Sequence, residues 1–115
     1  MTEARIFHLA IAEVWYAAER AGAPYAPDDY EADGFIHCST ADQLVATANR
    51  YYRGRRDLML VELEAARLGD SLVWEPGRRD RSELFPHLYD TVDRDTVIGV
   101  QGFLPGPDGD FHALR

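Results

Sequence analysis

The sequence predicts an α+β fold with six short strands and two main helices. Its 115 residues fit one hydrophobic core, and 46% of them are apolar, as in packed globular domains. The patterning gives six short strands but only two long helices, and parallel strands usually need a helical crossover between them. No repeat or linker divides the chain, so residues 1–115 are expected to form a single domain.

The chain opens with an expected strand over residues 4–9 and an expected helix over residues 12–21. Val14, Trp15 and Ala18 fall on one stripe of that helix, as in a helix that packs against a core. The glycine and proline that follow residue 21 are typical helix-ending signals.

A loop is expected over residues 25–33, followed by a short second strand over residues 34–38. Thr40 and Gln43 then have the spacing of a capping box, in which each side chain hydrogen-bonds the other residue's backbone amide. This pattern predicts the second helix, from residue 42 to about residue 52.

The other expected strands cover residues 58–63, 72–74, 84–89 and 96–104. A turn is expected at Gly69 and Asp70, and Pro76 should close the fourth strand. An acidic turn over residues 93–95 separates the last two strands.

The net charge of −8 argues against general nucleic-acid binding, because affinity for polyanions comes mainly from basic residues that neutralise phosphates. Every basic residue is an arginine, and two groups stand out: Arg50, Arg53, Arg55 and Arg56, then Arg78, Arg79 and Arg81. Each group is either a solvated face or a site for an anionic ligand.

The single cysteine, Cys38, excludes an internal disulfide, and no secretion signal is recognised at the start of the sequence. No apolar run approaches the roughly 20 residues that cross a bilayer. We therefore expect a cytoplasmic protein that does not enter the membrane. The sequence does not determine its oligomeric state.

Polar chemistry is expected around His8, His37, Ser39 and His87. His37 and Ser39 share one face of the second strand because side chains alternate along a strand. His8 lies in an apolar strand, where an unpaired ring is costly, and His87 with Tyr89 has a similar setting. Each histidine alone is more often a satisfied core residue, but a shared polar cleft explains all three together.

Glu75 ends the fourth strand and is a candidate acid, base or acceptor of a ribose hydroxyl. Its structural alternative is an exposed carboxylate at a turn. Ser39 and Thr40 precede a helix whose free amides can receive a phosphate or carboxamide. Their structural alternative is simple helix capping.

Cys38 points away from His37 on an ideal strand, so we expect it to pack in the core rather than to act as a nucleophile. A catalytic zinc ion bound by three of the four residues His8, His37, His87 and Cys38 is an alternative. The chain lacks a recognised metal-binding spacing, so no metal is predicted, and a zinc-dependent hydrolase is kept as an alternative.

A family resemblance rests on Ile6-Phe7-His8, Trp15, Gly34 to Thr40, Trp74-Glu75 and Phe85 to Tyr89. These segments, above all GFIHCS and FPHLY together, resemble a bacterial family catalogued as domain of unknown function 952. The resemblance covers nearly the whole chain. That family is similar in fold to the ADP-ribosyltransferases, small split-sheet α+β proteins that bind NAD in a cleft between two antiparallel sheets. The resemblance therefore implies an ADP-ribosyltransferase-like fold with split antiparallel β-sheets and two main helices.

With the resemblance added, the predicted catalytic residues are His8, His37, His87 and Glu75, the last provided that its strand reaches the same cleft. The predicted contacts to NAD come from His8, His37, Ser39, Thr40 and Tyr89. The transferases often carry a glutamate on a later strand, where this sequence offers His87 and Tyr89. The implied function is binding of NAD or another ADP-ribose-containing nucleotide, with transfer or cleavage of ADP-ribose. A non-catalytic nucleotide-binding or sensor module is the alternative from another class.

Overall fold

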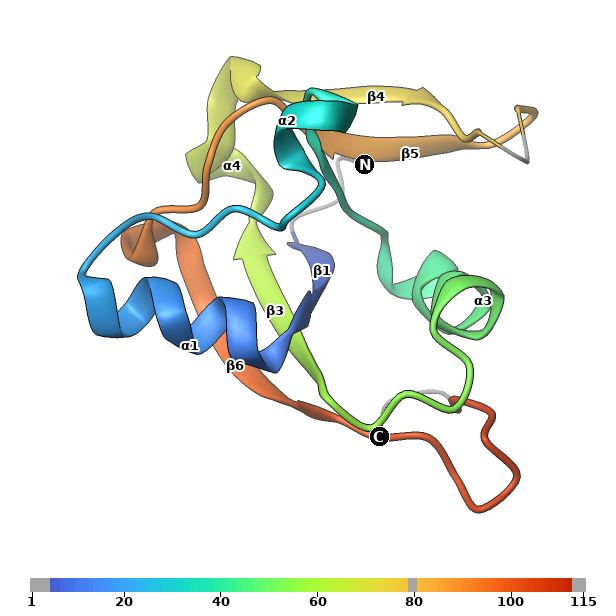
Figure 1. The fold of residues 1–115 in the computed structure, drawn as a ribbon. Coiled ribbons are helices and arrows are strands. Elements are labelled where there is room, and N and C mark those ends of the chain that lie inside the picture. Colours follow the sequence, from blue (N-terminus) through green and yellow to red (C-terminus); the bar gives the residue numbers. More distant parts are fainter. Residues whose placement is uncertain (1–4, 79–80, 113–115) are drawn as a thin grey trace.

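The computed structural model describes residues 5–78 and 81–112, which form two three-stranded antiparallel sheets with helices around them (Figure 1). The first sheet consists of β1 (Arg5–Ile11), β3 (Leu58–Glu64) and β6 (Val97–Phe103) in the order β1-β3-β6. The second consists of β2 (Ile36–His37), β5 (Leu84–Leu88) and β4 (Leu72–Pro76) in the order β2-β5-β4. The expected α+β class with two small antiparallel sheets is confirmed.

Both faces of the first sheet are covered along β1 and most of β3, which explains why β1 is apolar almost throughout, whereas most of β6 is exposed. On one face, Ile6, Val61 and Leu63 pack with Trp15 from α1 (Ala12–Ala21) and with Ile36 and Leu88 from the second sheet. That core packs the two sheets against each other. The helical stripe predicted for Val14, Trp15 and Ala18 faces this core, as expected.

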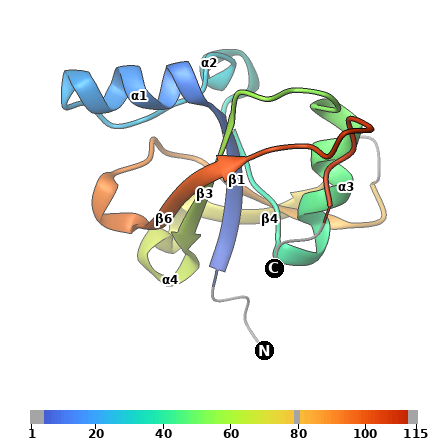
Figure 2. The same cartoon turned by 90° about the horizontal axis from the view of Figure 1, so that it is seen from below.

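The other face of the first sheet packs against α3 (Ala41–Tyr51) and the C-terminal segment. Leu44 and Ala48 of α3 contact the cluster around Phe7 and Leu9, which Phe111 completes. In Figure 2, α3 and the end of the chain lie on one side of β1, whereas α1 lies apart from them. The helix bounds predicted for α1 and α3 agree with the structure to within one residue.

The second strand is shorter than predicted and covers only two of the residues 34–38. After His37 the chain leaves the second sheet, and Ser39 forms an isolated bridge to Phe7 on β1. The amide of each of these two residues donates to the carbonyl of the other at 2.8 Å. This exchange places the start of α3 beside the first sheet.

One local prediction was wrong, and at two turns, which lie where they were expected, the structure adds short helices. The expected loop over residues 25–33 ends in a short helix, α2 (Tyr30–Asp33), and the turn at Gly69 is built from α4 (Ala65–Leu68) and the 3₁₀-helix η1 (Gly69–Ser71). A second 3₁₀-helix, η2 (Arg94–Thr96), occupies the acidic turn. These elements are too short to produce a helical period in the sequence.

β4 extends beyond the predicted residues 72–74 and ends at Pro76, which closes the strand as predicted. Proline is tolerated there because β4 is an edge strand, where one side of the backbone needs no partner. Among the described helices, none has the length and apolar character required to cross a bilayer.

Candidate functional site

A cavity of about 660 Å³ opens between α3, β1 and the second sheet. Four of the seven predicted catalytic or NAD-contacting residues line it: His8, His37, Ser39 and His87. Three others, Thr40, Glu75 and Tyr89, lie outside its wall. The structure thus gathers the predicted histidines around one space, and their functional roles remain predictions.

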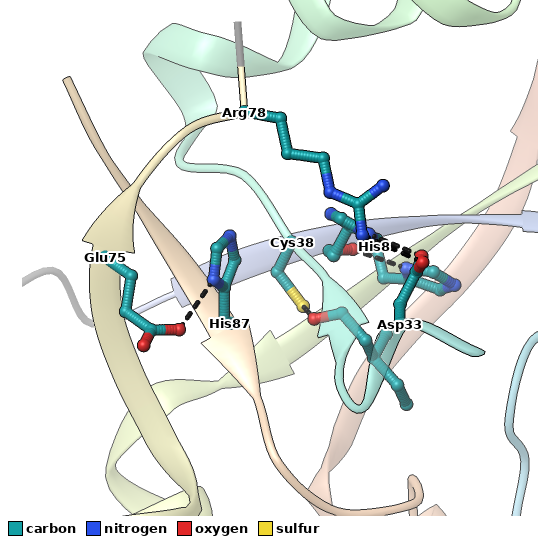
Figure 3. A network of polar contacts seen from close by, with 8 residues as sticks. His8, Asp33, Cys38, Glu75, Arg78 and His87 are labelled. Carbon is teal, nitrogen blue, oxygen red and sulfur yellow. Dashed lines mark hydrogen bonds and ion pairs between the residues drawn. The ribbon is translucent and has the colours of Figure 1, made fainter. Parts of the chain in front are cut away.

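His87 and His37 lie directly opposite each other on the paired strands β5 and β2, with ring centroids 5.7 Å apart. Nδ1 of His87 donates a hydrogen bond of 2.8 Å to Oε1 of Glu75, which projects from the neighbouring strand β4. In the neutral ring, Nε2 is then the hydrogen-bond acceptor. Figure 3 shows this second ring nitrogen on the side of His87 that faces away from Glu75.

Glu75 and the His87 ring are held from two further sides. The hydroxyl of Tyr89 donates to the same Glu75 oxygen at 2.6 Å. Phe35 stacks on the His87 ring with a centroid distance of 4.0 Å and an interplanar angle of 18°. The ring therefore has a fixed plane and a fixed tautomer.

Burial lowers the pKa of His87 below its ordinary value, although the Glu75 carboxylate opposes this shift. The hydrogen bonds from Tyr89 and His87 lower the pKa of Glu75. At neutral pH this pair is therefore a carboxylate beside a neutral imidazole.

His37 has its own carboxylate partner. Its Nε2 lies 2.8 Å from Oδ2 of Asp33, the last residue of α2. The other oxygen of Asp33 accepts a hydrogen bond of 2.8 Å from Arg78, whose side chain extends toward it in Figure 3. These hydrogen bonds lower the pKa of Asp33, so Asp33 links the segment after β4 to His37 as an anion.

His8 differs from the other two because protein groups use both of its ring nitrogens. Nδ1 donates to the backbone carbonyl of His37 at 2.7 Å, so the neutral ring accepts at Nε2 from the hydroxyl of Tyr25 at 2.8 Å. Burial lowers the pKa of His8 to about 4, so the ring is neutral at pH 7. This arrangement favours a structural role over the ligand contact implied by the family resemblance.

Ser39 and Thr40 follow the structural alternative more closely than the ligand-binding one. The Thr40 hydroxyl accepts from the Gln43 amide at 3.2 Å, and the Gln43 side chain accepts from the Thr40 amide at 3.0 Å, which confirms the capping box. Ser39 is buried at the cavity wall and donates to the Thr47 hydroxyl at 3.4 Å. Of the two, only Ser39 faces the cavity.

Cys38 packs in the core between the sheets, as expected, and burial raises the pKa of its thiol to about 12. A thiolate is therefore scarce at neutral pH, which argues against a nucleophilic cysteine. Within residues 5–78 and 81–112, no three His, Cys, Asp or Glu side chains are grouped for metal binding. Those residues therefore do not form the zinc site that was considered for three of His8, His37, His87 and Cys38.

Three site residues were missed by sequence reasoning: Asp33, Tyr25 and Gln43. Gln43 donates to Glu83 at 3.0 Å and to the Leu84 carbonyl at 2.8 Å, which ties α3 to the hairpin between β4 and β5. The spacing of Asp33 and His37, four residues apart, was a usable signal. The contacts of Gln43 and Tyr25 cross the fold and left no trace in the sequence.

Of the arginine groups, Arg50, Arg55 and Arg78 line the cavity, and Arg79 lies outside the described residues. Arg55 is paired with Asp57 and Arg78 with Asp33, whereas Arg50 has no ion pair within the described part of the chain. Carboxylates outnumber the guanidinium groups along the wall: Asp28, Asp29, Asp33, Asp42 and Glu83. The cavity therefore carries both signs of charge.

The sequence matches the family described as a protein of unknown function (DUF952) over residues 9–100. The crystal structure of protein CC0527 from Caulobacter crescentus is similar to this chain with a TM-score of 0.83 and 32% sequence identity, covering 94% of this chain and 93% of that one. Its solution NMR structure gives a TM-score of 0.80 at 32% identity over 94% and 91% of the two chains. Among curated proteins, no match to this sequence is found.

Proposed function

This chain belongs to the DUF952 family, and we propose that it is an ADP-ribosyltransferase-like domain that binds NAD or another ADP-ribose-containing nucleotide. The observation that carries the proposal is the single cavity of about 660 Å³ that His37, Ser39 and His87 share. Small-molecule sites commonly measure about 300–1,000 Å³ and combine apolar walls with a few polar groups. Histidine and serine side chains are suited to ribose hydroxyls because they both donate and accept hydrogen bonds.

The charges of the cavity also suit the oxidised dinucleotide. Arg50 offers a guanidinium group without an ion-pair partner within the described residues, which suits a diphosphate. The nicotinamide ring of NAD is cationic, and the carboxylates of the wall favour a cation. A ligand with one anionic part and one cationic part fits this mixed wall better than a polyanion.

Isothermal titration with NAD and ADP-ribose tests the proposal, with adenosine as the control that lacks phosphates. We expect saturable binding of NAD and ADP-ribose and weaker binding of adenosine. Thermal shift gives a second readout, because a ligand bound only to the folded state adds RT ln(1 + [L]/Kd) to its stability. Absence of binding at millimolar concentrations would rule the proposal out.

A non-catalytic nucleotide-binding module is the second candidate, and the placement of Glu75 favours it. In the transferases a late-strand glutamate holds the nicotinamide ribose, whereas Glu75 lies outside the cavity wall and accepts from His87 and Tyr89 through one oxygen. Binding without release of nicotinamide would select this candidate over the enzyme.

A further inference from the structure

We infer that His87, oriented by Glu75, is the proton acceptor that activates a hydroxyl nucleophile, water or an alcohol, for attack on the nicotinamide ribose of NAD. The inference rests on the proposed function and assigns its reaction class and acceptor class. In this scheme, His87 and the Glu75 carboxylate hydrogen-bonded to it take the place of the ribose-holding glutamate of the transferases.

The geometry of the pair is that of an oriented general base. A carboxylate at 2.8 Å from Nδ1 fixes the tautomer in which Nε2 carries the lone pair. Figure 3 shows the second ring nitrogen on the side of His87 away from Glu75. Because His87 lines the cavity and Glu75 does not, we assign this nitrogen and its lone pair to the cavity side. Glu75 is thus a positioning residue, and His87 is the group that meets the substrate.

The pair is also rigid. Residues 75 and 87 lie on adjacent antiparallel strands, with Val73 as the register partner of His87 and Phe85 as that of Glu75. Phe35 fixes the ring plane and Tyr89 fixes the carboxylate, as described above. The side chain of His87 is only 8% exposed, so water does not compete freely for the ring. Such preorganisation is what acid–base catalysis requires.

The surrounding charges keep the ring available as a base. Burial, His37 on β2 and Arg78 beyond β4 all lower the pKa of His87, whereas Glu75 raises it. From α3, Asp42 and Gln43 line the same cavity, and Glu83 faces it from the hairpin. The balance leaves His87 neutral at pH 7, with Nε2 free of a proton.

The base strength of a neutral His87 favours one class of ADP-ribose acceptor over another. An ammonium acceptor has no lone pair and must lose a proton with a pKa of about 10 before it can attack, whereas a hydroxyl has lone pairs at neutral pH. A hydroxyl becomes acidic only as its oxygen bonds to carbon, and an imidazole can take the proton at that point. Hydroxyl acceptors therefore match the site, and protonated amino groups do not.

In the step, the hydroxyl oxygen forms a bond to the anomeric carbon of the nicotinamide ribose. The carbon–nitrogen bond breaks, and its electron pair neutralises the pyridinium nitrogen of the departing nicotinamide. The hydroxyl proton passes to Nε2 of His87 and then to solvent. NAD and an alcohol thus give nicotinamide, an O-linked ADP-ribose and one proton, and water gives free ADP-ribose.

The test is nicotinamide release from NAD by the full chain, in water and with added methanol, together with ADP-ribose affinity. His87→Gln should lower the rate by at least about 100-fold, the range expected for a lost general base, with ADP-ribose affinity changed less than about threefold. His112→Gln is the matched control, because His112 is an exposed histidine outside the cavity, and it should leave the rate unchanged. Methyl ADP-ribose should form in the wild type.

Glu75→Gln supplies the second variant if His87→Gln fails to fold. Removing the carboxylate that raises the pKa of His87 should move the rising limb of the pH–rate profile to lower pH and reduce the maximal rate. A purely structural role of Glu75 would leave the limb in place and overturn the inference.

Full nicotinamide release by folded His87→Gln would also overturn it, as would NAD binding without release in the wild type. In both of these cases, ADP-ribose binding would keep the proposed function intact.

Discussion

The hydroxyl of Tyr25 lies 2.8 Å from Nε2 of His8, and this contact satisfies a polar ring that the first sheet buries to 5% exposure. With Nδ1 bonded to the carbonyl of His37, the imidazole joins β1, the segment before α2 and the second sheet. His8 is therefore a buried cross-link between parts of the chain that are distant in sequence.

We expect His8→Ala to lower the free energy of unfolding by at least about 1–3 kcal/mol, because the change leaves the His37 carbonyl and the Tyr25 hydroxyl unsatisfied. Tyr25→Phe, which removes only one of the two bonds, should cost less. Urea denaturation measures both values. Affinity for ADP-ribose should change little in either variant, and a large loss of affinity at unchanged stability would instead assign His8 to the ligand.

His8 also makes stability depend on pH. Its pKa is about 4 in the folded protein against 6.5 for the free side chain, so the unfolded chain binds the extra proton between those values. The contribution of neutral His8 to the free energy of unfolding should be fully present above pH 6.5 and should be lost as the pH drops toward 4. At 1.36 kcal/mol per pKa unit, the loss is on the order of 3 kcal/mol.

Urea midpoints from pH 4 to pH 8 check this dependence. His87 adds a slope of the same sign, since its pKa is also lowered, so the diagnostic quantity is the difference between wild type and His8→Gln. That difference should shrink as the pH falls below 6.5. A pH-independent difference would show that folding does not lower the pKa of His8.

Thr40→Ala should destabilise the protein by about 0.5–2 kcal/mol, because it removes the side chain that caps α3. Thr40→Ser keeps the hydroxyl and is the matched control. Because Thr40 lies outside the cavity wall, we expect ADP-ribose affinity to stay within about twofold. Chemical denaturation and titration calorimetry measure the two quantities, and an affinity loss without destabilisation would restore Thr40 as a ligand contact.

Arg50→Ala should weaken ADP-ribose binding about tenfold or more, since hydrogen bonds to charged groups contribute about 1.5–3 kcal/mol and Arg50 lines the cavity. Arg56→Ala is the control, an exposed arginine of the same group that lies outside the wall. The difference should shrink at high salt because ions screen exposed charges. Equal affinity in the two variants would place the phosphates elsewhere.

By itself the sequence determined the elements that have a local cause. The periodicity of apolar residues gave α1 and the strands of the first sheet, and the spacing of Thr40 and Gln43 gave the start of α3. It also singled out His8, His37, Ser39 and His87, because polar side chains within apolar strands need partners.

Only the tertiary structure decided which partners these are. Glu75 meets His87 because β4 and β5 pair in one register, and a shift by one residue would send the carboxylate to the other face. Asp33 reaches His37 from a four-residue helix that is too short to show a period, and Tyr25 reaches His8 across the core. Strand register and core packing depend on contacts between distant segments, so the same histidines in the sequence are compatible with either structural or chemical roles until those contacts are known.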